Sequence, residues 1–496
     1  MKKDILQFGT PEEAGISSRN VVKFIEDIKK KRTMMHSFIF IRNGKVFAEG
    51  YYPPFVQDEF HRMYSVSKTF VSMAVGALIG EGKLSLDDKV VSFFPDKCPG
   101  YVHPWVADAT VRDLLRMATP FREGTTYKVS DPDWSYTFFN TEPNHPAGTI
   151  FNYDTSGSYI LDVIVERITG KPFMEYLKEK ALKAIGFSEG SFCVKAPEGY
   201  SWGGSGVMCS TRDLARLALL VANDGMFEGR ELLPADYLKE ARSFQIDNNT
   251  SGNNNLYSGL GYGYQIWRTY DNGYSFVGMG GQLAITIPEK NFIAVFTGDS
   301  QGHSVPYGGV FEALRDNITD HLGDVMPADQ AALSEMKEAI ANLTPAMLAG
   351  KESSPAAKGI SGVTYRMNRE DRMGIRKLTL NLGEDEGELV YDTTRGLKTL
   401  RFGFGKFVVG TFPETHYFGD TIGTPSGKGY RYMAQAVWTE ERKLVLRVYL
   451  IDMYFGNFTA TFAFKGDEVA LSMEKTAEWF LEEYQGFTAG KAESSF

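Results

Sequence analysis

Hydrophobic positions in the first part of the chain alternate between the spacing of helices and the spacing of strands. Residues 16–31 repeat apolar side chains every three or four positions, which predicts a helix. Residues 37–42 and 45–49 are expected to form strands joined by the strong hairpin turn Asn43-Gly44. These patterns predict a first domain, 1–325, that mixes helices and strands. Further helices are predicted over 63–79, from Ser158 to Gly170 and over 310–322, and further strands over 283–288 and 292–296.

The rest of the chain is dominated by strand patterns. A helix is predicted over 329–343, and Gly, Ser and Pro residues in 350–357 indicate a linker, so that 326–358 connects two domains. Beyond it, several stretches alternate apolar and polar residues and are separated by Gly and Asp, as in an antiparallel sheet that closes on itself or packs on another. We expect a β-barrel-like, lipocalin-like domain over 359–488 and a frayed tail over 489–496. The clearest alternating stretches are 377–382, 443–450 and 458–465.

Composition and charge narrow the classes of protein that fit this pattern. A chain of 496 residues is expected to hold two or three domains, and 43 % hydrophobic residues exclude disorder as its main state. The net charge of −9 disfavours a nucleic-acid partner. No apolar run approaches the length of a membrane span, and the N-terminus turns polar too early for a signal peptide. The protein is therefore expected in the cytoplasm, without a membrane partner.

The cysteines and histidines give no support to a metal or a cofactor. Cys98, Cys193 and Cys209 are an odd number without metal-like spacing, which disfavours a disulfide framework and a structural zinc site. The seven histidines are scattered, and neither HExxH nor a phosphate-binding GxxxxGK[ST] motif occurs. We therefore expect no metal and no cofactor.

The strongest candidate chemistry lies in Ser65-Val66-Ser67-Lys68. Residues three apart share one face of a helix, so the Lys68 amine can reach the Ser65 hydroxyl. Serine becomes a nucleophile when a base removes its proton. Burial among apolar neighbours would lower the pKa of Lys68, so that its neutral amine could accept this proton. The same spacing at 334–337 and 472–475 lies in charged stretches and is expected on solvated helix faces.

Two further segments add candidate groups. Tyr153 precedes the helix expected from Ser158, where its hydroxyl can exchange a proton if a lysine cation lowers its pKa; a packed aromatic is the alternative. Small residues in 278–282 let a backbone N–H approach an oxyanion together with the N–H of Ser65. A Gly-rich strand start is the alternative for that segment.

These segments, in this order, resemble the serine β-lactamase-related family, which includes class C β-lactamases, DD-peptidases, esterases and aminohexanoate-oligomer hydrolases. The resemblance covers about residues 10–322. It implies an α+β fold, with an antiparallel sheet flanked by helices and a helical subdomain, ahead of the C-terminal antiparallel β-barrel-like domain. The matching stretches are 64–70, 81–88, 110–115, 146–149 with Tyr153, and 203–215.

The resemblance also implies roles for individual residues. Ser65 would be the acylated nucleophile, Lys68 the general base and Tyr153 the proton relay. The backbone N–H groups of Ser65 and Met279 would form the oxyanion hole. Candidate substrate-binding residues are Thr155, Gly278, Gly280, Trp202 and His61. From their positions alone, His61 and His303 could both lie near the cleft, although either is more often a structural or surface histidine, and Trp202 could equally be packed in the core.

Two positions depart from the family pattern. Tyr153-Asp154-Thr155 ends in threonine where the family usually has asparagine or serine. Phe276 stands where the family usually has lysine or histidine, so a substrate carboxylate has no cation there and β-lactamase activity is disfavoured.

The sequence leads to one preferred function and one alternative. The preferred function is a serine hydrolase that cleaves a small ester, amide or peptide through an acyl-enzyme on Ser65. The alternative is a catalytically weak relative that binds a peptide or cell-wall fragment, which the departures at Thr155 and Phe276 favour. The intact Ser65, Lys68 and Tyr153 disfavour this alternative. The sequence leaves three alternative roles open for the C-terminal domain: it covers the cleft, binds a ligand, or mediates self-association into a homo-oligomer.

Overall fold

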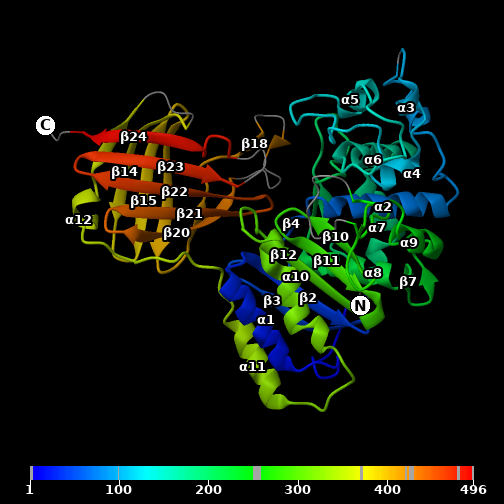
Figure 1. Ribbon diagram of the computed structural model, residues 1–496, viewed down its shortest axis with the longest axis horizontal. Helices are drawn as coiled ribbons and strands as arrows, with labels where there is room; N and C mark the ends of the chain where they lie inside the picture. Colours follow the sequence, from blue (N-terminus) through cyan, green and yellow to red (C-terminus); the bar gives the residue numbers. More distant parts are fainter. Residues whose placement is uncertain are drawn as a thin grey trace. The chain divides into compact units, whose positions relative to one another are not determined.

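The protein consists of two compact units, Met1–Pro345 and Ala346–Phe496, shown in Figure 1. The computed structural model describes residues 4–98, 100–249, 259–368, 373–418, 422–423, 429–476 and 481–493. Among the helices of this described part, none combines the length and the hydropathy that crossing a bilayer requires. Each unit is described by itself below.

The N-terminal unit is built on a seven-stranded sheet in the order β1-β3-β2-β12-β11-β10-β9. The pairs are antiparallel except for β1 with β3. The early strand β2 lies beside the late strand β12, blue next to green in Figure 1, so both ends of the unit contribute to its centre. The strands are β1 Gln7–Phe8, β2 Met35–Arg42, β3 Lys45–Tyr51, β9 Trp267–Arg268, β10 Tyr274–Gly278, β11 Gln282–Ile287 and β12 Phe292–Gly298.

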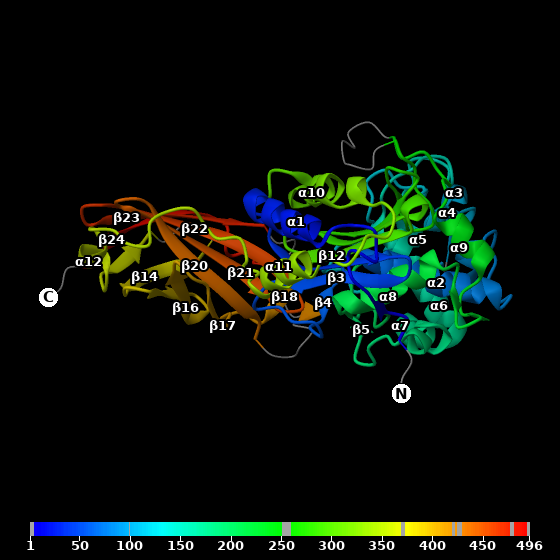
Figure 2. The same cartoon turned by 90° about the horizontal axis from the view of Figure 1, so that it is seen from below.

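Helices cover both faces of this sheet. On one side α1 (Ser18–Lys31) packs with α10 (Val310–Asn317) and α11 (Gln330–Ala341), and α8 (Thr211–Ala222) covers the other side. Figure 2 shows α1 and α10 on one side of β3 and β12, with α8 opposite. The buried ring of Phe24 on α1 lies 5.0 Å from that of Phe40 on β2, measured between ring centroids. This arrangement confirms the expected antiparallel sheet flanked by helices.

A helical part surrounds the long helix α2 (Val66–Gly80). This helix is apolar on nearly all sides because it lies against β10 and the helices α6, α7 and α9. It begins three residues later than the sequence predicts, because His61 and Arg62 form the short strand β4 and pair with β6. The other elements here are α3 Pro104–Ala107, α4 Val111–Leu115, α5 Trp134–Asn140, α6 Thr155–Thr169, α7 Phe173–Lys180, α9 Ala235–Ala241, β5 Phe192–Cys193, β6 Val207–Cys209, β7 Met226–Phe227 and β8 Arg230–Glu231.

The helix expected to belong to the connecting segment packs on the N-terminal unit instead. Arg19 on α1 forms ion pairs of 3.0 Å with both Asp329 and Glu335, at the start of α11 and within it. Met336 of α11 is buried in the same hydrophobic core as α1. The first unit therefore extends to Pro345, and only the residues after it connect the two units.

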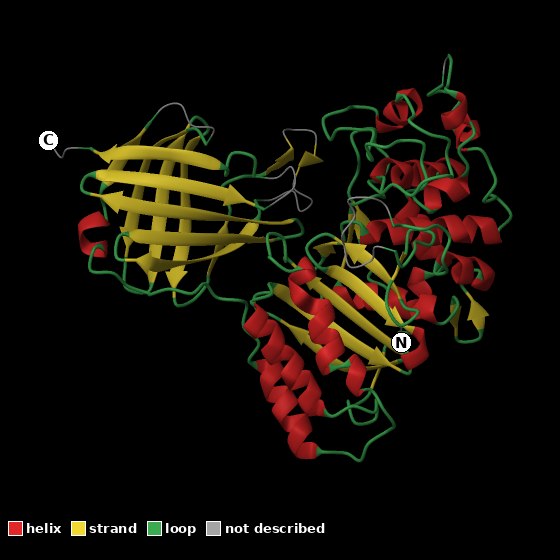
Figure 3. Cartoon of the chain, viewed as in Figure 1, coloured by secondary structure: helices red, strands yellow, loops and turns green. Residues whose placement is uncertain are grey.

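The C-terminal unit is a closed barrel of nine strands, which confirms the expected barrel and has one strand more than a lipocalin. Around the circuit β16-β15-β14-β13-β24-β23-β22-β21-β20, each pair is antiparallel. With an odd number of strands the first and last run in the same direction, so β16 and β20 close the barrel as a parallel pair. Figure 3 shows its front strands crossing the rear strands.

The strands of the barrel follow the alternating stretches of the sequence closely. The final strand β24 continues to Ala492 and pairs with β13 and β23, so the expected tail begins too early; residues 494–496 lie outside the described residues. The elements are α12 Ala357–Ile360, β13 Thr364–Met367, β14 Ile375–Leu382, β15 Glu386–Thr393, β16 Gly396–Phe404, β17 Val408–Thr411, β18 His416–Phe418, β19 Ile422–Gly423, β20 Arg431–Glu440, β21 Lys443–Ile451, β22 Phe455–Lys465, β23 Glu468–Lys475 and β24 Gly486–Ala492.

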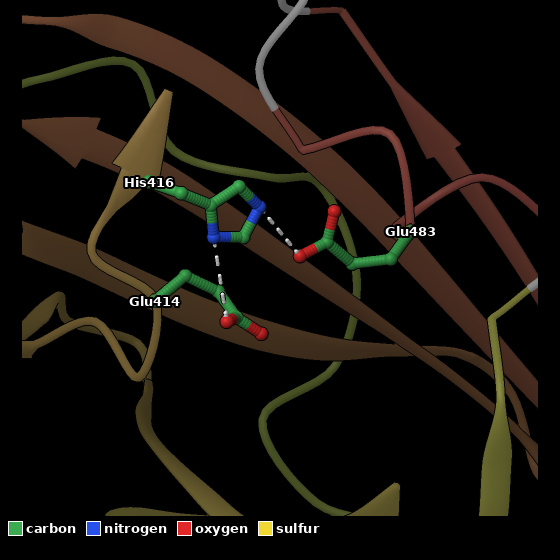
Figure 4. Close-up of side chains that lie close together, drawn as sticks. All are labelled: Glu414, His416 and Glu483. Carbon is green, nitrogen blue, oxygen red and sulfur yellow. Dashed lines mark ion pairs between the residues drawn. The ribbon is translucent and has the colours of Figure 1, made fainter. Parts of the chain in front are cut away.

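One charged cluster lies in the barrel. Glu414, His416 and Glu483 bring three metal-ligand atoms within 4.8 Å of one another, with His416 between the carboxylates (Figure 4). The buried Lys398 pairs with Glu414, and Arg395 donates to Glu483 over 3.4 Å. Two carboxylates therefore already face two cations, and a divalent ion would add uncompensated positive charge. We interpret the cluster as an ion-pair network.

Removal of the Lys398 amine is expected to destabilise the barrel strongly. Lys398 shares the inward face of β16 with Leu400 and Phe402, and its side chain and that of Glu414 are 7 % and 6 % exposed. Lys398→Met would leave a buried carboxylate without its cation, at a cost of about 3–5 kcal/mol. Hydrogen exchange of peptides from β20–β22, measured in the full chain, would report this as lost protection.

The matched control is Arg401→Met on the same strand. Its ion pair with Glu386 is exposed, and such pairs contribute less than about 1 kcal/mol. The double variant Lys398→Met/Glu414→Gln should recover most of the lost protection because it removes the unpaired charge. Equal exchange rates in Lys398→Met and the unmodified protein would contradict a stabilising ion pair.

Candidate active site

Ser65 and Lys68 meet at the N-terminal end of α2. The Lys68 Nζ donates hydrogen bonds to the Ser65 Oγ over 2.9 Å and to the backbone oxygen of Gly204 over 2.7 Å. Ser65 is the N-cap residue of the helix, and Lys68 follows one turn later. Lys68 is 1 % exposed and lies among the apolar residues of a buried helix. The amine is therefore held against the hydroxyl in surroundings from which water is largely excluded.

Tyr153 lies on the other side of this pair. Its ring stacks on Trp267 at a centroid distance of 5.4 Å, and the Lys68 Nζ lies 5.1 Å from its ring centre. Burial raises the pKa of Tyr153, and a contact with the Ser65 hydroxyl lowers it only in part. The condition that a lysine cation lowers this pKa is not met, because desolvation dominates. The Tyr153 side chain is thus a neutral phenol at neutral pH.

Asp154 determines where helix α6 begins, so that Tyr153 lies just before the helix. Its carboxylate caps α6 by accepting from the backbone N–H of Ser156 over 2.8 Å, and it also accepts from the Thr119 hydroxyl over 2.7 Å. The helix therefore starts at Thr155 rather than at Ser158. This buried cap fixes the backbone next to Tyr153.

The turn between β10 and β11 forms the third side of the site. Met279 and Gly280 line the same cavity as Ser65 and Tyr153. Gly280 has a φ of +80°, which favours glycine, and a Cβ added to Gly278 would come within 2.3 Å of the backbone oxygen of Met63. Glycine at 278 thus lets β10 approach the start of α2.

Gln282 holds this turn in place, a role that the sequence did not reveal. Its fully buried amide nitrogen donates to the backbone oxygens of Met279 and Gly298, each over 2.8 Å. Its amide oxygen accepts from the Gly298 N–H over 3.1 Å. These bonds link the end of β12 to the Met279 carbonyl, so a side chain fixes the direction of this carbonyl.

A cavity of about 360 Å³ opens beside the Ser65 hydroxyl. Its walls are aromatic, aliphatic or neutral and polar. None of the described residues that line it is Asp, Glu, Lys or Arg. An unpaired charge is costly in such surroundings. The lining residues are Ser65, Tyr153, Trp267, Val277, Met279, Gly280, Ser300, Gln301, His303, Val305, Pro306 and Tyr307.

Several residues expected to bind substrate are absent from this lining. His61 is buried on β4 near Phe55 and His36, and Trp202 donates to the Tyr127 hydroxyl over 3.2 Å from a buried position. Thr155 faces Gly204, where its Cγ2 would contact an added Cβ at 2.5 Å. Gly278 faces Met63, as described above. Their positions support the walls of the site from behind.

The position of Phe276 follows from the alternation of β10. Phe276 is 1 % exposed and packs near Tyr274, whereas its neighbour Val277 lines the cavity. His303 does line the cavity, but backbone groups of Val305 and Lys31 occupy both its ring nitrogens. It is therefore held as part of the wall.

Trp267 and Tyr307 are wall residues that the sequence did not single out. Trp267 reaches the site because β9 pairs with β10, a short-strand contact without a sequence pattern. Tyr307 reaches the site through an irregular turn in which its own φ is +49°. Burial raises the pKa of Tyr307 to about 12. Pairing of short strands and left-handed turns leave little trace in hydrophobic spacing.

Comparison with known proteins gives relatives for the N-terminal unit. The chain is 25 % identical over 248 residues to 6-aminohexanoate-dimer hydrolase of Paenarthrobacter ureafaciens, covering 46 % of this chain and 63 % of that protein. The chain thus spans less than two thirds of the length of this curated relative.

Two solved structures have the same fold in this region. A family VIII carboxylesterase matches with a TM-score of 0.52 and 15 % identity, covering 63 % of this chain and 99 % of its own. A penicillin-binding protein homologue from Caulobacter crescentus matches with a TM-score of 0.50 and 15 % identity, covering 61 % and 99 %. At these identities the likeness concerns the fold alone.

A family model described as "Beta-lactamase" matches residues 25–314. This range includes Ser65, Lys68, Tyr153 and the turn at Met279. Since it spans more than half of the 496 residues, the chain belongs to the beta-lactamase family.

Proposed function

We propose that the protein is a serine hydrolase that cleaves a small, uncharged ester or amide through an acyl-enzyme on Ser65. The observation that carries this proposal is the 2.9 Å hydrogen bond from the Lys68 Nζ to the Ser65 Oγ at the wall of a cavity. The family to which the chain belongs and the name of its curated relative, a 6-aminohexanoate-dimer hydrolase, support the same reaction class.

In the proposed mechanism Lys68 acts as the general base. It accepts the proton of the Ser65 hydroxyl as the Oγ attacks the substrate carbonyl. For this role the amine has to be neutral when the Oγ attacks; Lys68 is buried among the apolar residues of α2. The backbone N–H groups of Ser65 and Met279 would hold the oxyanion, and each such donor typically contributes on the order of 3 kcal/mol to the transition state.

Tyr153 serves as the proton relay in this mechanism. As a neutral phenol in contact with Ser65, it passes its proton to the departing oxygen or nitrogen and is reprotonated from Lys68. Water then enters and attacks the acyl carbonyl, and the same groups act in the reverse direction.

Cytoplasmic location and self-association through the C-terminal unit stay predictions from the sequence.

The first test is covalent labelling of the serine. A fluorophosphonate probe is expected to modify Ser65 in the unmodified chain and to leave Ser65→Ala unlabelled, with the site identified by peptide mass spectrometry. Ser67→Ala is the matched control, because the Ser67 hydroxyl is buried and accepts from the Val207 N–H over 3.0 Å. Equal labelling of Ser65→Ala and the unmodified chain would refute the nucleophile.

The second test concerns the base. Lys68→Met should lower kcat/KM for a p-nitrophenyl ester by about 10²–10⁴-fold, the usual contribution of general base catalysis. Lys178→Met is the control, since Lys178 is equally buried but bonds to Glu175 and the backbone of residues 189 and 191. Turnover that survives in Lys68→Met would refute Lys68 as the base, whereas no turnover in any form of the chain would favour the alternative of a binding protein.

The third test concerns substrate charge. We expect kcat/KM for p-nitrophenyl butyrate to exceed that for the p-nitrophenyl monoester of glutarate by at least about tenfold, because no lysine or arginine is among the described residues that line the cavity. Val305 lines the cavity and is 39 % exposed, so an arginine should fit at this position. Val305→Arg is expected to reduce the ratio of the two kcat/KM values, and Val305→Met is expected to leave this ratio unchanged. A preference for the charged ester in the unmodified chain would contradict an uncharged substrate.

A further inference from the structure

The residue immediately before Ser65 has a strained backbone. Tyr64 has a φ of +46°, the left-handed region that bulky side chains rarely adopt, and it is only 2 % exposed. It connects β4 to the capping residue of α2, so its conformation determines where Ser65 points. A strained residue at this place persists only if its surroundings hold it.

Arg62 provides such a hold. Its guanidinium carbon lies 4.4 Å from the centre of the Tyr64 ring and 4.4 Å from that of the Trp202 ring, and the side chain is fully buried between them. A planar guanidinium stacks on aromatic rings in a way that an ammonium group does not reproduce. The Tyr64 ring is therefore clamped against the arginine.

The same guanidinium is attached to the loop that binds the lysine. Its Nε donates to the backbone oxygen of Ser205 over 2.9 Å, and its Nη2 donates to the Ser205 hydroxyl over 2.9 Å. The preceding residue, Gly204, supplies the carbonyl that accepts from the Lys68 Nζ. One side chain thus contacts both the peptide that orients the serine and the loop that orients the base.

Glycines at 203 and 204 let this loop pack closely against α6. A Cβ on Gly203 would come within 2.6 Å of the Asp162 Cβ, and one on Gly204 within 2.5 Å of the Thr155 Cγ2. On this side the Asp162 carboxylate accepts from the Gly203 N–H over 3.1 Å. Arg62 is therefore one of several supports of this loop, beside Asp162 and the Lys68 amine itself.

We propose that Arg62 is a positioning residue for the Ser65–Lys68 pair, acting through Tyr64 on the nucleophile and through Ser205 and Gly204 on the base. Arg62 is absent from the residues that line the cavity, so it does not hold a substrate carboxylate. This inference rests on the proposed function and adds to it a buried residue whose effect is on rate rather than on substrate binding.

The test compares acylation with substrate binding. Arg62→Met should lower both kcat and the rate of fluorophosphonate labelling of Ser65 by at least tenfold, with KM changed less than threefold. Arg62→Lys should be intermediate, because lysine keeps the charge and a donor but loses the stacked plane. All rates are measured at a temperature at which thermal unfolding shows each variant to be folded.

Two further variants separate positioning from a general loss of stability. Arg216→Met removes another buried arginine, paired with Asp4 and Asp213, and should lower stability with kcat unchanged. Glycine adopts positive φ without strain, so adding Tyr64→Gly to Arg62→Met should restore part of the lost labelling rate. If Arg62→Met does not fold, Ser205→Ala, which removes only the hydroxyl acceptor, is expected to lower kcat with KM unchanged.

Each outcome either supports or overturns the proposed role of Arg62. Wild-type labelling rates in folded Arg62→Met, or in Ser205→Ala if it replaces that variant, would overturn the proposal, as would an equal loss of kcat in Arg216→Met. Absence of labelling and turnover in the unmodified chain would refute the proposed function itself. This result differs from a failure of the Arg62 proposal because it is seen before any variant is compared.

Discussion

The structure of the site depends on the burial of a lysine amine against a serine hydroxyl. A buried amine needs hydrogen-bond acceptors, and Lys68 finds them in the Ser65 Oγ and the Gly204 carbonyl. One acceptor lies at the start of the same helix and the other in the 202–206 loop, so α2 and this loop must meet for the amine to be satisfied. Much of the N-terminal unit can be understood as the scaffold for this meeting: α2 supplies the apolar surroundings, and β10 ends against its first turn.

Hydrophobic spacing predicted the strands β2, β3, β11 and β12, the helices α1, α2, α6, α10 and α11, and the barrel. It did not predict β1, β9, β10 or α8. The boundaries next to the site were less predictable. Helix α2 starts at Val66 because Met63 still donates to the Val207 oxygen beside β4 and Tyr64 has a φ of +46°, and α6 starts at Thr155 because Asp154 caps it. Such local hydrogen bonds compete with helical periodicity and win at the ends of helices.

The candidate site could be predicted only as far as motifs reach. Ser65, Lys68, Tyr153 and Met279 were named from spacing and resemblance, and they lie together around one cavity or beside it. Trp267, Tyr307 and Gln282 were not, because they are brought there by strand pairing and turns between distant segments. Conversely, Trp202 and His61 are close in sequence to motif residues but point into the core. Sequence proximity fixes neither the direction of a side chain nor its neighbours.

The order of strands in the C-terminal unit has a consequence for how that unit can be handled. Its first and last strands, β13 and β24, are neighbours, and the backbone N–H of Glu493 donates to the oxygen of Thr364 over 2.8 Å. The two ends of the barrel are therefore within one short peptide of each other. A circular permutant could join them and open the chain at a hairpin elsewhere, such as the turn between β22 and β23, while keeping every strand pair. The barrel is thus topologically suited to transplantation as a cassette between other domains.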